Sequence, residues 1–135
     1  MSDEKTSGTR TLKVLVYSDD RQVREQVRLA LGSRIAADLP EVETVDVATQ
    51  AAAVHEVDSG GYDVLIADGE AVPSGGMGLC HQLKDEVADC PPVVLLVARV
   101  ADAWLASWSR ADAISTHPVD PLELPRVVAD VVRAA

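Results

Sequence analysis

Residues 62–79 read YDVLIADGEAVPSGGMGL and combine an apolar run, an acidic residue, a glycine-rich connection and the start of a helical pattern. The run Val64–Ala67 is apolar at successive positions, which is typical of a parallel strand covered on both faces. Asp68 follows directly, at the carboxyl end of that strand. Beyond the connection, apolar residues recur at helical spacing from Leu79 to Val87. The stretch therefore predicts a strand–loop–helix unit with an acid at the turn.

The same alternation extends in both directions from this unit. Further apolar runs of strand length occur at Leu12–Tyr17, Val45–Ala48, Val93–Ala98 and Ala113–Thr116. Helical patterns cover Arg21–Ala37, Gln50–Asp58 with Thr49 as N-cap and Gly60–Gly61 as stop, the segment before Pro91–Pro92, a short stretch after Asp102, and Leu124–Val132. Five strands alternating with five helices predict a parallel α/β sheet. The strand order is either flavodoxin-like, 2-1-3-4-5, or that of a Rossmann half.

The composition indicates one compact domain. The chain has 135 residues, of which 47% are hydrophobic and 3% aromatic, so valine, leucine, isoleucine and alanine must form the core. This length suffices to bury a core without disulfides or metal ions. Residues 1–10 are polar and lack apolar periodicity, which predicts a flexible N-terminal tail before a domain spanning residues 11–135.

Charge and cysteine content argue against several classes of protein. Twelve basic against 22 acidic residues give a net charge of −10, whereas nucleic acid and anionic membranes are bound by basic surfaces. Cys80 and Cys90 cannot form a disulfide framework, which favours a reducing compartment. No apolar run approaches the ~18 residues of a membrane span, and residues 1–10 are too polar for a signal peptide. We expect a cytoplasmic protein without direct membrane insertion.

Three stretches together resemble the receiver domain of bacterial two-component response regulators. They are LKVLVYSDD at residues 12–20, YDVLIADGEAVPSGGMGL at 62–79 and AISTHPVDPLEL at 113–124. The resemblance implies a flavodoxin-like three-layer αβα sandwich, with a five-stranded parallel sheet in the order 2-1-3-4-5 and five helices. It also makes Asp68 the phosphoacceptor-equivalent residue, at the carboxyl edge of the sheet where ligands bind in such folds.

The residues that assist phosphorylation in this family are replaced here. Aligned without gaps, the two acidic metal-binding positions after the first strand fall on Ser18 and Asp19, so one carboxylate is missing. Val97 replaces the Thr or Ser that hydrogen-bonds the phosphoryl group, and His117 replaces the lysine before Pro118. Histidine is shorter than lysine and mostly neutral at pH 7. The resemblance is therefore to atypical receivers, or pseudo-receivers, in which the phosphorylation switch is lost.

The acidic residues near Asp68 allow two interpretations. A residual pocket of Asp19, Asp20 and Asp68 would bind Mg²⁺ weakly, because clustered carboxylates favour a counter-ion. Alternatively, these residues are solvated strand ends, with Asp20 as the cap of the following helix. His117 is either a pH-sensitive partner of Asp68 or, as we favour, a neutral hydrogen-bonded ring.

A second group of residues predicts a protein-binding surface. Trp104 and Trp108 are four residues apart, which places them on one face of the expected fourth helix. This is a helix that receivers commonly use for partners, and aromatic anchors are frequent in such interfaces. Ile114 takes the position of the family's switching aromatic residue. The predicted partner face comprises Trp104, Leu105, Trp108, Arg110 and Ile114.

The expected function is that of a binding module, not an enzyme: a phosphorylation-independent receiver that docks on a protein. The segments LVYSD, DGEAVPSGGMG, WLASWSRAD and HPVDP are similar to an actinobacterial type of single-domain receiver, and the chain ends at Ala135 without an expected output domain. That type is associated with respiratory complex I, the proton-pumping NADH dehydrogenase. The resemblance implies an accessory subunit, without a cofactor of its own, held at the inner membrane through this partner.

Two other functions compete with this expectation. In the first, the chain is a phosphorylation-competent regulator, and Asp68 accepts phosphate from a histidine kinase or a small phosphodonor. In the second, the same fold carries a flavin, a cobalamin or a nucleotide. The sequence SDDRQ after the first strand disfavours this carrier function, because it is acidic and lacks a phosphate-binding loop.

Overall fold

The computed structural model of the chain describes residues 10–71, 75–98 and 109–135. Their elements follow in the order β1 (Leu12–Tyr17), α1 (Arg21–Leu31), β2 (Val42–Val47), α2 (Gln50–Ser59), β3 (Val64–Asp68), α3 (Gly76–Glu86), β4 (Val93–Val97), β5 (Ala113–Thr116) and α5 (Glu123–Ala134). The five strands are all parallel and lie in the order β2-β1-β3-β4-β5. This order is the flavodoxin-like one, so the Rossmann-half alternative is excluded.

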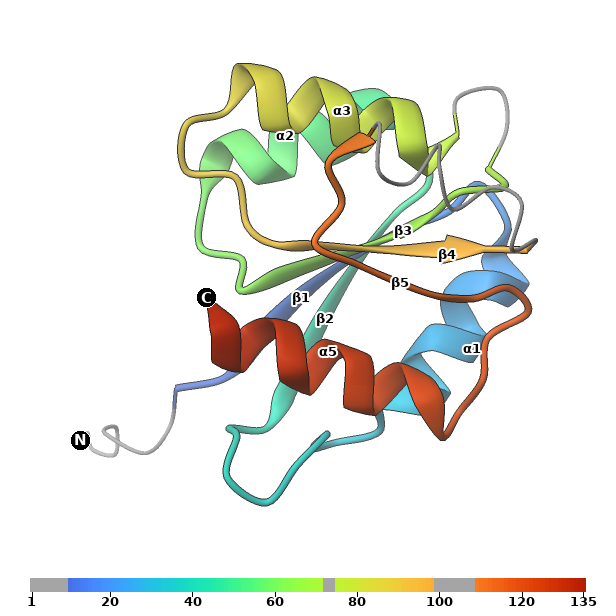
Figure 1. Cartoon of the computed structure of the whole chain (residues 1–135), viewed down its shortest axis with the longest axis vertical. Coiled ribbons are helices and arrows are strands. Elements are labelled where there is room, and N and C mark those ends of the chain that lie inside the picture. Colours follow the sequence, from blue (N-terminus) through green and yellow to red (C-terminus); the bar gives the residue numbers. More distant parts are fainter. Residues whose placement is uncertain (1–9, 72–74, 99–108) are drawn as a thin grey trace.

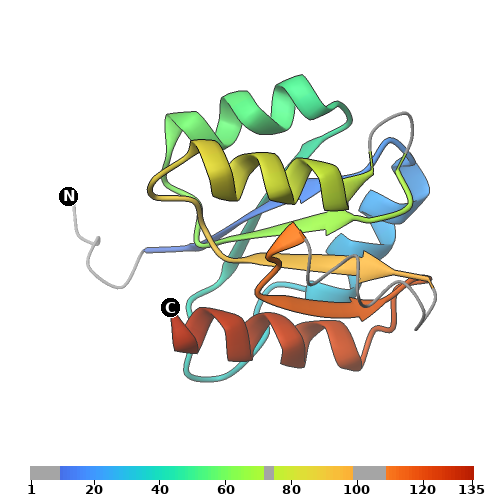
Figure 2. The ribbon, with the colours of Figure 1, turned by 45° about the horizontal axis from the view of Figure 1, so that its top comes forward.

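The sheet is covered by helices on both faces. Figure 1 shows α2 and α3 above the sheet and α1 and α5 below it, and the turned view in Figure 2 keeps the same three layers. Each interface has its own core, because side chains of a strand point alternately to the two faces. The core under α2 and α3 includes Leu15, Leu65, Leu79, Leu83 and Leu95. The core over α1 and α5 includes Val14, Val27, Ile66, Leu96, Leu124 and Val128.

The strands match the apolar runs of the sequence most closely in the middle of the sheet. Every residue of β3 and β4 is buried, as expected for strands with neighbours on both sides and helices on both faces. β2 lies at the edge and is only partly buried. It begins at Val42, earlier than the predicted Val45, because the polar residues Glu43 and Thr44 interrupt the apolar run without disturbing the ladder with β1.

The first helix is shorter than its apolar pattern predicts. The prediction extended to Ala37, but α1 ends at Leu31, and Gly32 adopts a φ of 62°. Glycine reaches this left-handed region without a steric cost, so the helix stops there. Ile35, the last apolar residue of the pattern, still packs against the core from the loop. The predicted N-cap of α2 is confirmed, since the Thr49 side chain accepts the Ala52 N–H.

Some predictions fall at the margins of the described structure. The expected helix after Asp102 lies within residues 99–108, outside the described residues, as do residues 1–9 of the predicted tail. Arg10, the last residue assigned to that tail, forms an ion pair with Asp63 at 2.9 Å. In the described parts of the chain, every helix is too short or too polar to cross a membrane.

Candidate functional site

The register of the sheet brings Ser18 and Asp68 side by side. Tyr17, the last residue of β1, pairs with Ala67 of β3, so the next residue on each strand lies at the same level of the carboxyl edge. Ser18 is fully buried, and only 2% of Asp68 is exposed. A buried carboxylate needs hydrogen-bond donors, so its surroundings determine what it can do.

Two donors satisfy the Asp68 carboxylate. The Ser18 hydroxyl donates to Asp68 Oδ2 at 2.7 Å, the ordinary length of an O–H···O hydrogen bond. The Glu70 N–H donates to Asp68 Oδ1 at 2.8 Å. Ser18 Oγ in turn accepts the Asp20 N–H at 3.0 Å, which fixes the hydroxyl. Ser18 stands where the resembling family has an acidic residue, and its hydroxyl forms a hydrogen bond to the Asp68 carboxylate.

His117 also lies beside Asp68. Its Nε2 lies 3.4 Å from Asp68 Oδ1, longer than a strong hydrogen bond, and its backbone N–H donates to Val97 O at 3.1 Å. The His117 side chain is 23% exposed, so the imidazole lies partly at the surface beside the buried carboxylate. Val97 is buried at the end of β4 and has no donor for a phosphoryl oxygen.

The predicted metal-binding set is not brought together. Asp20 is the N-cap of α1 and accepts the Gln22 N–H at 2.8 Å, as the ungapped register predicts, while Asp19 is exposed. Across the described residues, no three His, Cys, Asp or Glu side chains form a group that could hold a metal ion. The structure therefore gives no support to a preformed three-carboxylate site of Asp19, Asp20 and Asp68. Weak Mg²⁺ binding near Asp68 stays a prediction.

Two residues of the site were missed by the sequence analysis. Arg24 donates from Nη1 to the Ser18 carbonyl at 2.5 Å, and its Nε lies 3.8 Å from Asp46 Oδ2. This arginine therefore ties the end of β1 to α1 and β2, and nothing in its sequence spacing announces that role. Tyr17 is buried next to Ser18, and burial together with Asp19 and Asp68 raises the pKa of its hydroxyl.

The loop after β3 approaches the site through glycines. A Cβ on Gly76 would lie 2.7 Å from the Asp68 carbonyl oxygen, so only glycine lets α3 begin this close to the strand end. A Cβ on Gly69 would lie 2.7 Å from the Leu96 carbonyl oxygen of β4. The start of α3 is thereby packed directly against the backbone of Asp68.

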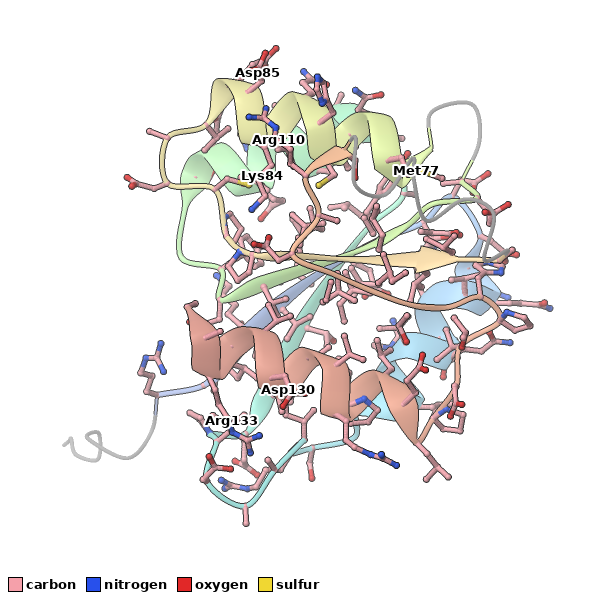
Figure 3. The ribbon with its side chains drawn as sticks, viewed as in Figure 1. Met77, Lys84, Asp85, Arg110, Asp130 and Arg133 are labelled. Carbon is pink, nitrogen blue, oxygen red and sulfur yellow. The ribbon has the colours of Figure 1, made fainter. Side chains whose placement is uncertain are left out.

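The predicted partner face is only partly described. Trp104, Leu105 and Trp108 lie outside the described residues. Arg110 is exposed, and Figure 3 shows it close to Asp85 on α3, with which it pairs at 3.3 Å. Ile114 is 45% exposed on β5, which lies at the edge of the sheet. Among the residues of the predicted partner face that the structure describes, Ile114 is the apolar one.

Comparison with known proteins finds similar response regulatory proteins. Two proteins of Mycobacterium tuberculosis, from strains CDC 1551 / Oshkosh and ATCC 25618 / H37Rv, are each named an uncharacterized response regulatory protein. Each is 54% identical to the chain over 123 residues, which is 91% of this chain and 92% of the relative. No model of a known protein family matches the chain.

Solved structures show the same fold. The receiver domain of the Francisella response regulator 1452 superimposes with a TM-score of 0.77 at 21% identity, over 92% of this chain and 98% of that one. The response regulator TrrA of Thermotoga maritima, solved in complex with Mg²⁺ and BeF, gives a TM-score of 0.71 at 24% identity, over 88% and 97% of the two chains. The chain therefore belongs to the response regulator family, as a receiver domain.

Proposed function

We propose that this receiver domain acts as a phosphorylation-independent protein-binding module. The observation that carries the proposal is the buried Ser18 hydroxyl, which donates to Asp68 at 2.7 Å. In this arrangement the carboxylate is stabilised by the protein's own donors. It does not depend on a cation or a phosphoryl group to hold its surroundings together.

The chemistry of phosphoryl transfer supports the same conclusion. Transfer to a carboxylate depends on positioning and on cationic groups that neutralise the incoming phosphoryl oxygens. Oδ2 of Asp68 already accepts the Ser18 hydroxyl, and Val97 offers no donor at the end of β4. His117 is the one basic side chain that the described structure pairs with Asp68. An acyl phosphate on Asp68 would therefore lack most of its stabilising contacts.

Incubation with acetyl phosphate tests the proposal. The intact chain is treated with acetyl phosphate and Mg²⁺, and its mass is measured. We expect no adduct of one phosphoryl group. A hydroxylamine-labile adduct that disappears in Asp68→Asn would contradict the proposal and establish the phosphorylation-competent alternative.

A reconstructed variant serves as the positive control. Ser18→Asp supplies the second acid, Val97→Thr the hydroxyl and His117→Lys the cation. We expect the triple variant to gain more adduct than any single change, because the three groups would hold the same phosphoryl oxygens. Absence of adduct in a folded triple variant would indicate that the geometry of the pocket itself has diverged from that of phosphorylated receivers.

The partner is a protein under this proposal, and respiratory complex I is the first candidate to examine. The acidic balance of the chain, −10, opposes binding to nucleic acid. Binding of the purified domain to purified complex I is measured for the wild type and for Ile114→Asp. We expect the charged variant to bind at least roughly tenfold more weakly, since an exposed apolar contact would be lost. A histidine kinase that binds and phosphorylates the domain would support the alternative instead.

A further inference from the structure

A cavity of about 540 Å³ lies far from Asp68, at the amino ends of β4 and β5. It opens where the edge of the sheet meets α5 and the end of α3. Its apolar wall is formed by Pro92, Ala113, Ile114, Val127, Val131 and Ala134. We call this cavity the edge groove. Ile114 lines the edge groove and also belongs to the predicted partner face, so the groove and that face adjoin each other.

The charged residues of the edge groove leave it with an excess of negative charge. The ammonium of Lys84 pairs with Asp112 Oδ2 at 2.7 Å and is thereby neutralised. Asp130, on α5, is 81% exposed and lies 3.7 Å from Arg133, whose guanidinium is held by two bonds to Asp38 at 2.7 and 3.1 Å. Figure 3 shows Lys84 and Asp130 on helices that lie on opposite faces of the sheet. Because Arg133 is shared between Asp38 and Asp130, these three side chains keep one excess negative charge, and the exposed Asp130 carboxylate brings it to the groove.

An arginine side chain matches both features. Its aliphatic stem packs on apolar surface, while the planar guanidinium forms paired hydrogen bonds to a carboxylate. Lysine carries a compact, strongly hydrated charge and suits such a mixed surface less well. A second copy of this chain is a poor occupant, because two molecules of net charge −10 repel each other.

We propose that the edge groove receives an arginine side chain of the protein partner, flanked by apolar residues. The guanidinium binds Asp130, and the stem lies against Ile114 and Val127. This inference rests on the proposed docking function, since it specifies the chemistry of the partner that the domain recognises. It adds a polar contact at the amino ends of the strands, away from Ser18 and Asp68.

A peptide titration on the whole chain tests the inference. The probes are acetyl-Leu-Arg-Leu-amide and its citrulline counterpart, which has nearly the same shape without the charge. Binding is followed by the backbone amide NMR signals. We expect saturable shifts at Ala113, Ile114 and Val127, and roughly tenfold weaker binding of the citrulline peptide, since a charge-assisted bond is lost.

Matched variants identify the carboxylate. Asp130→Asn is expected to weaken the arginine peptide several-fold and leave the citrulline peptide unchanged. Asp58→Asn, an exposed acid of α2, is the control and should change neither. Equal affinity for both peptides, no effect of Asp130→Asn, or shifts confined to another face would overturn the inference. So would self-association of the chain through the edge groove, which would assign it to a second copy.

Failure here is distinguishable from failure of the proposed function. The acetyl phosphate experiment reports on Asp68 and is independent of the groove. If no phosphoryl adduct forms and Ile114→Asp weakens partner binding as expected, a negative peptide titration removes only the arginine contact. If the adduct forms, the phosphorylation-independent function is wrong whatever the peptide does.

Discussion

The identity of residue 18 determines how the Asp68 carboxylate is stabilised. A carboxylate at that position would repel Asp68 unless a cation lay between them. The serine hydroxyl donates to Asp68 instead, and it is itself fixed by the Asp20 N–H. Ser18 and Asp68 are both buried and cannot hydrogen-bond to solvent, so each depends on the other for this hydrogen bond.

Replacing Ser18 by alanine tests the strength of this contact. Ser18→Ala leaves one oxygen of a buried carboxylate without its donor, and we expect a loss of about 1–3 kcal/mol in the free energy of unfolding. The measurement is urea denaturation followed by circular dichroism. Ser59→Ala is the control, since its hydroxyl bonds an exposed helix carbonyl. Equal stability of Ser18→Ala and the wild type would show that water replaces the hydroxyl.

The buried Cys80 thiol predicts a pH dependence. Burial raises its pKa from 9.0 to about 11, so the folded chain keeps the thiol protonated where the unfolded chain loses its proton. This contribution to stability is complete below pH 9 and is lost as the pH rises toward 11. The unfolding free energy of Cys80→Ala should therefore decline less between pH 8.5 and 10.5 than that of the wild type. Parallel declines would show that another group titrates.

At the scale of elements, the start of α3 depends on the absence of a side chain. The helix has no side-chain cap, and its first residue packs on the carbonyl of Asp68. The site is thus braced by a strand–helix junction as well as by side chains. The loop between them contains residues 72–74, which lie outside the described structure.

Two glycines of α3 provide a matched pair of substitutions. Gly76→Ala puts a Cβ 2.7 Å from the Asp68 carbonyl oxygen, and we expect the free energy of unfolding to fall by about 1–3 kcal/mol, the usual cost of such overpacking. Gly78→Ala meets no atom within 4 Å and should stabilise the chain by about 0.5–1 kcal/mol, because alanine favours the helix. The free energy of unfolding of both variants is measured by chemical denaturation and compared with that of the wild type. Equal effects of the two changes would contradict the close approach at Gly76.

At the scale of the molecule, stability is concentrated in the middle of the sheet. β3 and β4 are buried along their whole length, whereas β2 and β5 are only partly buried. The binding surfaces proposed above lie on the more exposed strands and helices. The exposed residues of the edge strands can therefore contact a partner, while the two hydrophobic cores around the central strands stabilise the fold.

Amide hydrogen exchange should reveal this gradient. We expect the slowest exchange in β3 and β4, which open only in global unfolding, and faster exchange in β2 and β5. The difference is measured by NMR or mass spectrometry under native conditions. If β5 is protected as strongly as β3, the edge of the sheet is covered by another part of the chain or by a second copy.

Much of the fold could be predicted because its information is local. Successive apolar residues place β1, β3 and β4, and α2 begins after its Thr49 cap and ends at Gly60. Asp68 was found for the same reason, since it directly follows an unbroken apolar strand. The length of α1 was predicted wrongly because its apolar spacing continues past Gly32, where the backbone conformation stops the helix.

The sequence by itself determined the alternation of strands and helices and the replaced residues around Asp68. The tertiary structure decided the strand order, the hydrogen bond between Ser18 and Asp68, and the position of Arg24 behind Ser18. It also decided that Lys84 and Asp130, far apart in the chain, line one groove. The physical reason is range: backbone and burial preferences act between neighbours in sequence, whereas pairing across a sheet and closure of a cavity depend on packing of distant segments.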